Sequence, residues 1–161
     1  MFKFFFILII FTNVLIYKVN AQNIWTQKSD FPGLGKFAAV SFTIEDEAYV
    51  STGYDPISGQ WSQEVWQYNP VTNSWIQKAD FAGGDRQLAV GFSINGKGYI
   101  GLGDVHSTDF WEYDPNNDTW TQKADFPGGE RIEAVGFSIG NKGYIGTGFD
   151  LPTIFNDFWE Y

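Results

Sequence analysis

Basic side chains recur at matching places in this chain, and they are the first residues that suggest chemistry. Lys36, Arg86 and Arg131 are spaced 50 and 45 residues apart. Arginine binds a carboxylate through two parallel hydrogen bonds, and lysine contributes a compact positive charge. A site that gathered the three would therefore capture an anionic ligand, and the neighbouring Gln87 and Glu133 would offer hydrogen bonds or acid–base groups.

The same basic residues also have a structural interpretation. Arg86 follows Asp85 and Arg131 follows Glu130, so each arginine could pair with its neighbour or with an acid of an adjoining repeat. Ion pairs of this kind are common at the starts of structural elements and usually serve the fold. Both interpretations stay open at the level of the sequence.

Two further residues are candidates for ligand binding. Trp61 lies in the loop "YDPISGQWSQE", and an exposed aromatic ring on a loop can stack on a sugar or anchor a protein partner. His106 lies in the polar loop "GDVHSTD" and is the one histidine of the chain. A single imidazole does not hold a metal, and the chain contains no cysteine for a thiolate site or a thiol nucleophile. We therefore expect no metal, no cofactor and no catalytic residue.

The elements that position these residues are short strands. Residues 88–94, "LAVGFSI", alternate small and large side chains, and this period of two is typical of a strand. Asn95-Gly96 then predicts a tight hairpin turn, since both central residues of such a turn need positive φ. Residues 97–103 return as a second strand, 110–113 form a third, and "WTQK" at 120–123 forms a fourth.

This unit is repeated along the chain. "YNPVTNSWIQKADFAGGD" at 68–85 and "YDPNNDTWTQKADFPGGE" at 113–130 are nearly the same, and we place the repeats at about 25–74, 75–119 and 120–161. The length varies in the loop after the second strand. The residues that recur as structural positions are Trp25, Trp75 and Trp120; Tyr49, Tyr99 and Tyr144; Gly53, Gly103 and Gly148; and Trp66, Trp111 and Trp159.

The pattern "AVGFSINGKGYIGLG…FWEYDP…TW" resembles the kelch repeat and covers essentially all of residues 25–161. The paired glycine of that family appears here as Gly-x-Gly. The resemblance implies an all-β fold, a kelch-type β-propeller of four-stranded antiparallel blades, with about three blades present. It also implies that the first strand of each blade lines a central channel, so that Lys36, Arg86 and Arg131 would form a cationic collar at one mouth.

Two enzyme families of this architecture bear on function. Galactose oxidases hold copper with two histidines and two tyrosines, one of them bonded to a cysteine, and this chain cannot assemble that site. The family of exported N-acetylneuraminate epimerases acts on free sialic acid, which a cationic collar would suit. We expect a non-catalytic module that binds protein or glycan through its loops. The alternative is part of a sugar-acting propeller enzyme of either kind, whose active site lies outside this chain.

Residues 1–21 resemble a signal peptide, with Lys3 followed by an apolar run and a small-residue exit before Gln22. We therefore expect a secreted, periplasmic or cell-surface protein without membrane insertion after cleavage. Losing Lys3 and Lys18 leaves eight basic against nineteen acidic residues, so residues 22–161 carry a formal net charge of −11. Such a surface disfavours nucleic acid as a partner.

Three blades are few, because propellers typically have four to eight. Trp25–Lys28 reads as a fourth strand without a blade, whereas the last repeat stops at "FWEY" without its fourth strand. Two explanations stay open. The chain is part of a longer propeller, or two chains join as a homodimer in which each lends "WTQK" to the other.

Overall fold

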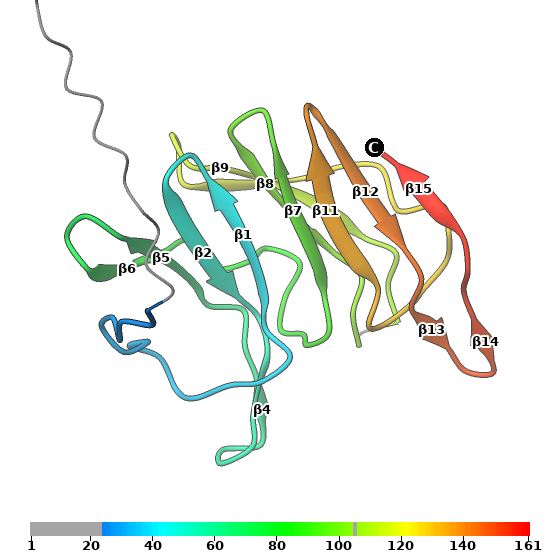
Figure 1. Ribbon diagram of the computed structural model, residues 1–161. Helices are drawn as coiled ribbons and strands as arrows, with labels where there is room; N and C mark the ends of the chain where they lie inside the picture. The colour runs from blue at the N-terminus through cyan, green and yellow to red at the C-terminus, as the bar shows by residue number, and fades with distance from the viewer. Residues whose placement is uncertain (1–23, 105) are drawn as a thin grey trace, which may run out of the picture.

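All regular structure in residues 24–104 and 106–161, which a computed structural model describes, is β-strand. Three antiparallel sheets stand side by side like blades, and they do not close into a ring (Figure 1). This confirms the predicted all-β fold of propeller blades. The predicted signal peptide lies outside the described residues. Within the described part of the chain, no helix is long and apolar enough to cross a membrane.

Two blades have four strands and the third has three. Blade 1 has the order β1-β2-β5-β6, blade 2 has β7-β8-β9-β10, and blade 3 has β11-β12-β15. The bounds are β1 Val40–Ile44, β2 Glu47–Ser51, β5 Val65–Asn69, β6 Ser74–Lys78, β7 Val90–Ile94, β8 Lys97–Gly101, β9 Phe110–Asp114, β10 Thr119–Gln122, β11 Val135–Ile139, β12 Lys142–Gly146 and β15 Phe158–Glu160.

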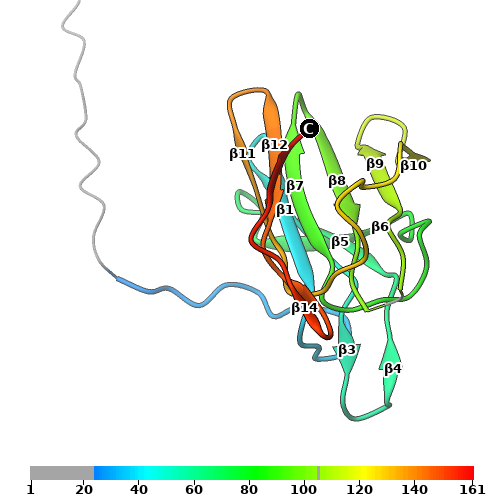
Figure 2. The same ribbon diagram turned by 90° about the vertical axis from the view of Figure 1, so that its right-hand side faces the viewer.

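Two short hairpins that the sequence did not predict extend from the blades. They are β3 (Tyr54–Asp55) with β4 (Gln60–Trp61), and β13 (Phe149–Asp150) with β14 (Thr153–Ile154). Both occupy the variable loop after the second strand of a blade, one in blade 1 and one in blade 3, and both extend from the lower edge of the blades in Figures 1 and 2. This loop is the part of the repeat that differs in length between the blades.

The predicted turns form as expected. Asn95 and Gly96 both have positive φ, 50° and 73°, and they join β7 to β8 in register Ile94 to Lys97. One predicted strand is absent: residues 24–30 form no strand, and Trp25 is fully exposed. The physical reason is that a strand needs a hydrogen-bonding partner, and nothing in the described chain lies beside this segment as a sheet.

The blades pack through large side chains on one sheet and glycines on the next. A Cβ atom added to Gly98 would lie 2.2 Å from the ring of Phe42, and one added to Gly143 would lie 2.0 Å from the ring of Phe92. Tyr49 and Tyr99 stack on these phenylalanines, with centroids 5.2 and 5.4 Å apart. The first strands β1, β7 and β11 thus form the line along which the blades meet (Figure 1).

A glycine stands two residues after the second strand of every blade, and its backbone conformation explains why. Gly53, Gly103 and Gly148 have φ of 101°, 102° and 85°, which side chains rarely tolerate. A Cβ atom at Gly103 would also lie 2.6 Å from the carbonyl oxygen of Gln87. This close approach ties the end of the second strand to the segment before the first strand, where the recurring basic residues lie.

Candidate functional site

Arg86 is buried at the centre of a bonded cluster in blade 2. Its side chain is 1% exposed, and its two terminal nitrogens lie 2.6 and 2.8 Å from the carboxylate oxygens of Asp109. It also donates to the carbonyls of Leu102 and Gly83, and its guanidinium lies 4.8 Å from the ring centroid of Phe81. These contacts use both terminal nitrogens of the arginine inside the blade, whereas its Nε is buried without a hydrogen-bond partner.

Arg131 repeats this cluster in blade 3. It binds Asp157 at 2.5 and 2.9 Å and donates to the carbonyl of Thr147. Phe126 and Phe155 lie against its guanidinium, at 4.9 and 3.8 Å. The side chain is buried, so it is held by the blade as Arg86 is.

Lys36 holds the corresponding position in blade 1 with weaker bonds. Its ammonium group donates to Ser62 at 2.9 Å and lies 3.3 Å from Glu64, whose side chain is 41% exposed. The ring of Phe31 lies 5.3 Å from the same ammonium group. The three basic residues therefore each sit on a phenylalanine and face an acid of their own blade.

The acids of these pairs were missed by the sequence analysis, which considered Asp85 and Glu130 instead. Glu64, Asp109 and Asp157 each stand two residues before the tryptophan of the third strand. The indole nitrogen of Trp111 donates to Asp109 at 2.7 Å, and that of Trp159 donates to Asp157 at 2.8 Å. The signal was present in the sequence as an acid at a fixed distance before tryptophan.

The pairing shifts the acidity of both aspartates. Burial alone would raise the pKa of Asp109, but hydrogen bonds from Arg86 and Trp111 outweigh it and hold that pKa below its ordinary value. The hydrogen bond from Arg131 lowers the pKa of Asp157 from 3.8 to about 2. Both carboxylates are therefore ionised at neutral pH, and each neutralises its arginine.

A cationic collar does not follow from this arrangement. The guanidinium groups of Arg86 and Arg131 are buried and bonded, so neither is presented to a ligand. The predicted partners Gln87 and Glu133 form no hydrogen bond with either arginine. Gln87 instead donates to Asp104 at 3.0 Å. The basic residues stabilise the blades in this structure.

His106 is exposed in the loop between β8 and β9. Its side chain is 81% exposed, and Nδ1 lies 3.5 Å from a carboxylate oxygen of Glu130. The shallow pocket around it also contains Asp104 and Asp150. Among residues 24–104 and 106–161, no group of three or more histidine, aspartate or glutamate side chains is arranged to hold a metal ion.

Trp61 lies in a separate, more developed groove. The groove has a volume of about 300 Å³ and runs between the β3–β4 hairpin and the segment that leads into blade 2. The indole of Trp61 is 40% exposed, and Asp80 and Asp85 line the groove with exposed carboxylates. The structure does not bring Trp61 and His106 into a common pocket.

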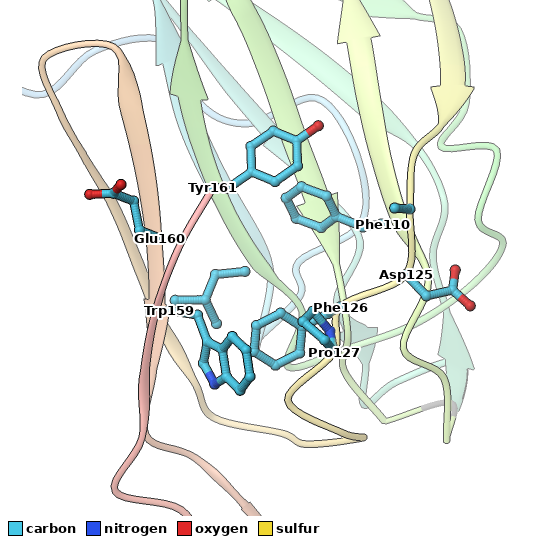
Figure 3. A pocket seen from close by; sticks show the side chains of 9 residues that line it. Phe110, Asp125, Phe126, Pro127, Trp159, Glu160 and Tyr161 are labelled. Atoms are coloured by element: carbon cyan, nitrogen blue, oxygen red, sulfur yellow. The ribbon is translucent and has the colours of Figure 1, made fainter.

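An apolar cavity opens at the outer edge of blade 3, and it has a volume of about 400 Å³ (Figure 3). Its walls come from the segment that leads into the blade and from the strand β15. The lining includes Phe110, Phe126, Pro127, Trp159 and Tyr161. Few polar groups face it, so it suits an apolar side chain better than a polar ligand.

The chain resembles solved structures in its fold. One that matches is titled "Structure of YjhT", with a TM-score of 0.70 and 22% sequence identity over 81% of this chain. At this identity the similarity supports the β-propeller fold and nothing finer. The alignment covers 49% of that structure, so this chain spans about half its length. Comparison with protein-family models gave no match, and comparison with curated proteins gave none either.

Proposed function

We propose that the chain is an exported, kelch-type β-propeller module that binds a glycan or a protein segment without catalysis. The observation that carries this proposal is the groove beside Trp61. It combines a half-exposed indole on the variable loop of blade 1 with two exposed carboxylates, Asp80 and Asp85, on the segment that leads into blade 2. Indole rings stack on the apolar faces of sugars and also anchor protein segments.

Charge selects among the ligands. The carboxylates of Asp80, Asp85 and Glu64 line the groove, and the one lysine in it, Lys36, is already bonded to Glu64. An anionic sugar would meet like charge there and would find no free cation to bind. The proposed ligand is therefore neutral or cationic. The alternative, a sugar-acting enzyme with its active site elsewhere, stays a prediction that this groove does not favour.

The test is a binding titration followed by tryptophan fluorescence. Neutral oligosaccharides, cationic chitosan oligosaccharides and anionic N-acetylneuraminate are compared with the wild-type chain and with Trp61→Ala. We expect binding of a neutral or cationic saccharide that weakens about 10-fold or more in Trp61→Ala, because the ring supplies the stacking surface. The control is Ile57→Ala, since Ile57 is 94% exposed and does not line the groove.

The outcomes separate the alternatives. Binding that Trp61→Ala leaves unchanged would refute the groove as the site. Preferred binding of N-acetylneuraminate would contradict the charge argument and favour the enzyme alternative. If no saccharide binds, the glycan part of the proposal fails, and the protein-binding part is tested by pull-down with the same two variants.

A further inference from the structure

The groove beside Trp61 has a counterpart at the next joint between blades. The groove lies where the loop after the second strand of blade 1 meets the segment that leads into blade 2. A second pocket, of about 170 Å³, lies where the corresponding loop of blade 2 meets the segment that leads into blade 3. Both are on the edge from which the hairpins extend, because each second strand ends beside the start of the first (Figure 1). The two pockets therefore hold equivalent positions of the repeat.

Backbone hydrogen bonds hold the two joints in the same way. The N–H of Gly53, after the second strand of blade 1, donates to the carbonyl of Arg86 at 2.8 Å. The N–H of Gly103, after the second strand of blade 2, donates to the carbonyl of Arg131 at 3.2 Å. The residue before each arginine is therefore held beside the variable loop of the preceding blade.

An acid occupies that position at both joints, and a ring-bearing side chain of the preceding blade lies beside it. At the first joint, Asp85 and Trp61 line the same groove. At the second joint, a carboxylate oxygen of Glu130 lies 3.5 Å from Nδ1 of His106. Phe149 adds an aromatic wall to this second pocket. Each pocket thus combines a carboxylate with an aromatic side chain.

Both carboxylates are accessible to a ligand. Asp85 is exposed, and the side chain of Glu130 is 43% exposed. They differ in this from the two aspartates that neutralise the buried arginines. Asp104 and Asp150 also line the second pocket, as Asp80 lines the groove. Each pocket therefore offers several carboxylate oxygens, which accept hydrogen bonds from hydroxyl groups and stronger, charge-assisted ones from ammonium groups.

The basic side chains at the two pockets do not cancel this charge. In the groove, Lys36 is bonded to Glu64. In the second pocket, Arg131 is bonded to Asp157. His106 is the remaining base among the lining residues, and three acids line the pocket with it. A ligand that carries positive charge at two places along its length therefore matches the pair of pockets.

Polar side chains connect the two pockets across blade 2. Gln87 follows Asp85 by two residues, and its Nε2 donates to Asp104 at 3.0 Å. Asp104 is itself a lining residue of the second pocket. Blade 2 has no hairpin at this edge, whereas the blades on either side do (Figure 1). An extended ligand can therefore pass over blade 2 from one pocket to the other, between the two hairpins.

The spacing of the pockets requires a chain of sugars rather than a single one. Packed sheets lie about 10 Å apart, and the pockets hold equivalent places at successive joints, so about 10 Å or more separates them. The walls also suit sugars. Ser62 and Gln60 line the groove with a hydroxyl and an amide, beside the indole of Trp61. Such walls bind the hydroxyl groups of a sugar while the indole stacks on its apolar face.

We propose that the two pockets are subsites for one linear oligosaccharide of amino sugars, with Asp85 binding one ammonium group and Glu130 another. Resting on the proposed function of the groove, this assignment narrows its ligand to a cationic saccharide that spans both pockets. Occupation of the first subsite raises the effective concentration of the remaining sugars at the second, so affinity increases once the chain spans both. A short amino sugar fills one subsite and lacks this gain.

The test compares short and long oligomers of glucosamine on the full chain. Binding of the dimer and of the hexamer is followed by tryptophan fluorescence and isothermal titration for the wild-type chain, Glu130→Gln and Trp61→Ala. We expect the hexamer to bind at least about 10-fold more tightly than the dimer. Glu130→Gln should remove most of this gain and leave the dimer in the groove unaffected, whereas Trp61→Ala should weaken both. The control is Glu45→Gln, which removes the same charge from the exposed turn between β1 and β2, at the opposite edge of the blade.

The outcomes distinguish this assignment from the proposed function. Equal affinities of the dimer and the hexamer, or equal losses of hexamer affinity in Glu130→Gln and Glu45→Gln, would overturn the second subsite. A dimer that still depends on Trp61 would then leave the groove in place as a binding site. If neither oligomer shows binding that depends on Trp61, both proposals fail. A lysine hexapeptide that binds more tightly than the glucosamine hexamer, with the same dependence on Glu130, would identify a basic protein segment as the partner and overturn the saccharide assignment.

Discussion

The buried pair of Arg86 and Asp109 offers the sharpest test of the structural role assigned to the recurring basic residues. Asp109→Asn keeps the shape of the side chain and an acceptor for Trp111, but it removes the charge that neutralises Arg86. The arginine is 1% exposed and would keep its charge inside the blade. Removing one partner of a buried ion pair costs about 3–5 kcal/mol, and the retained amide bonds place the expected loss near 3 kcal/mol.

Urea unfolding followed by tryptophan fluorescence measures this loss, because Trp111 donates to the same carboxylate. With a denaturant slope of roughly 2 kcal/mol per molar for a domain of this size, the unfolding midpoint should fall by about 1.5 M. The matched control is Glu64→Gln in blade 1. Glu64 is 41% exposed and contacts Lys36 at 3.3 Å, so its loss should cost about 1 kcal/mol or less.

The double variant Arg86→Met with Asp109→Leu completes the test. Replacing both partners with apolar side chains of similar size removes the uncompensated charge and should recover most of the stability. Equal effects of Asp109→Asn and Glu64→Gln would refute the reasoning. An unchanged midpoint for Asp109→Asn would mean that the blade does not depend on the charge of Asp109, and it would refute the structural role assigned to this ion pair.

Two further predictions concern acidity and packing. The pKa of Asp157 is lowered to about 2 in the folded chain, so the unfolded chain binds more protons between about pH 4 and pH 2, and the free energy of unfolding should fall as the pH is lowered through this window. Chemical unfolding at several pH values measures this, and a slope that Asp157→Asn leaves unchanged would contradict it. Gly98→Ala places a Cβ atom 2.2 Å from Phe42 and should cost about 1–3 kcal/mol in the same assay, whereas Gly35→Ala, with nothing within 4 Å, should be near neutral. Equal effects of these two alanine substitutions would refute the packing of blade on blade through glycine.

Much of the fold could be predicted from local sequence. Alternation of small and large residues in 90–94, the Asn95-Gly96 turn and the repetition of both along the chain place the main strands of the blades. These signals are local, because side-chain direction along a strand and positive φ in a turn are properties of adjacent residues. The strand predicted at Trp25–Lys28 did not form, since no strand of the described residues lies beside it as a sheet neighbour.

The candidate site was harder to predict from the sequence than the strands were. Residue types suggested Arg86 and Arg131 as ligand-binding groups, but their partners Asp109 and Asp157 lie 23 and 26 residues away. Only the sheet register brings the start of the third strand beside the segment before the first. The groove beside Trp61 likewise depends on the β3–β4 hairpin. Its two strands have only two residues each, which is too short for a recognisable strand pattern in the sequence.

By itself, the sequence determined the strands, their turns, the repeat and the absence of cysteine chemistry, because each of these follows from neighbouring residues or from composition. The tertiary structure alone decided that the arginines are buried in ion pairs and that an apolar cavity opens at the edge of blade 3. Both facts depend on contacts between segments distant in the chain, and such contacts are set by sheet register and by how one blade packs on the next.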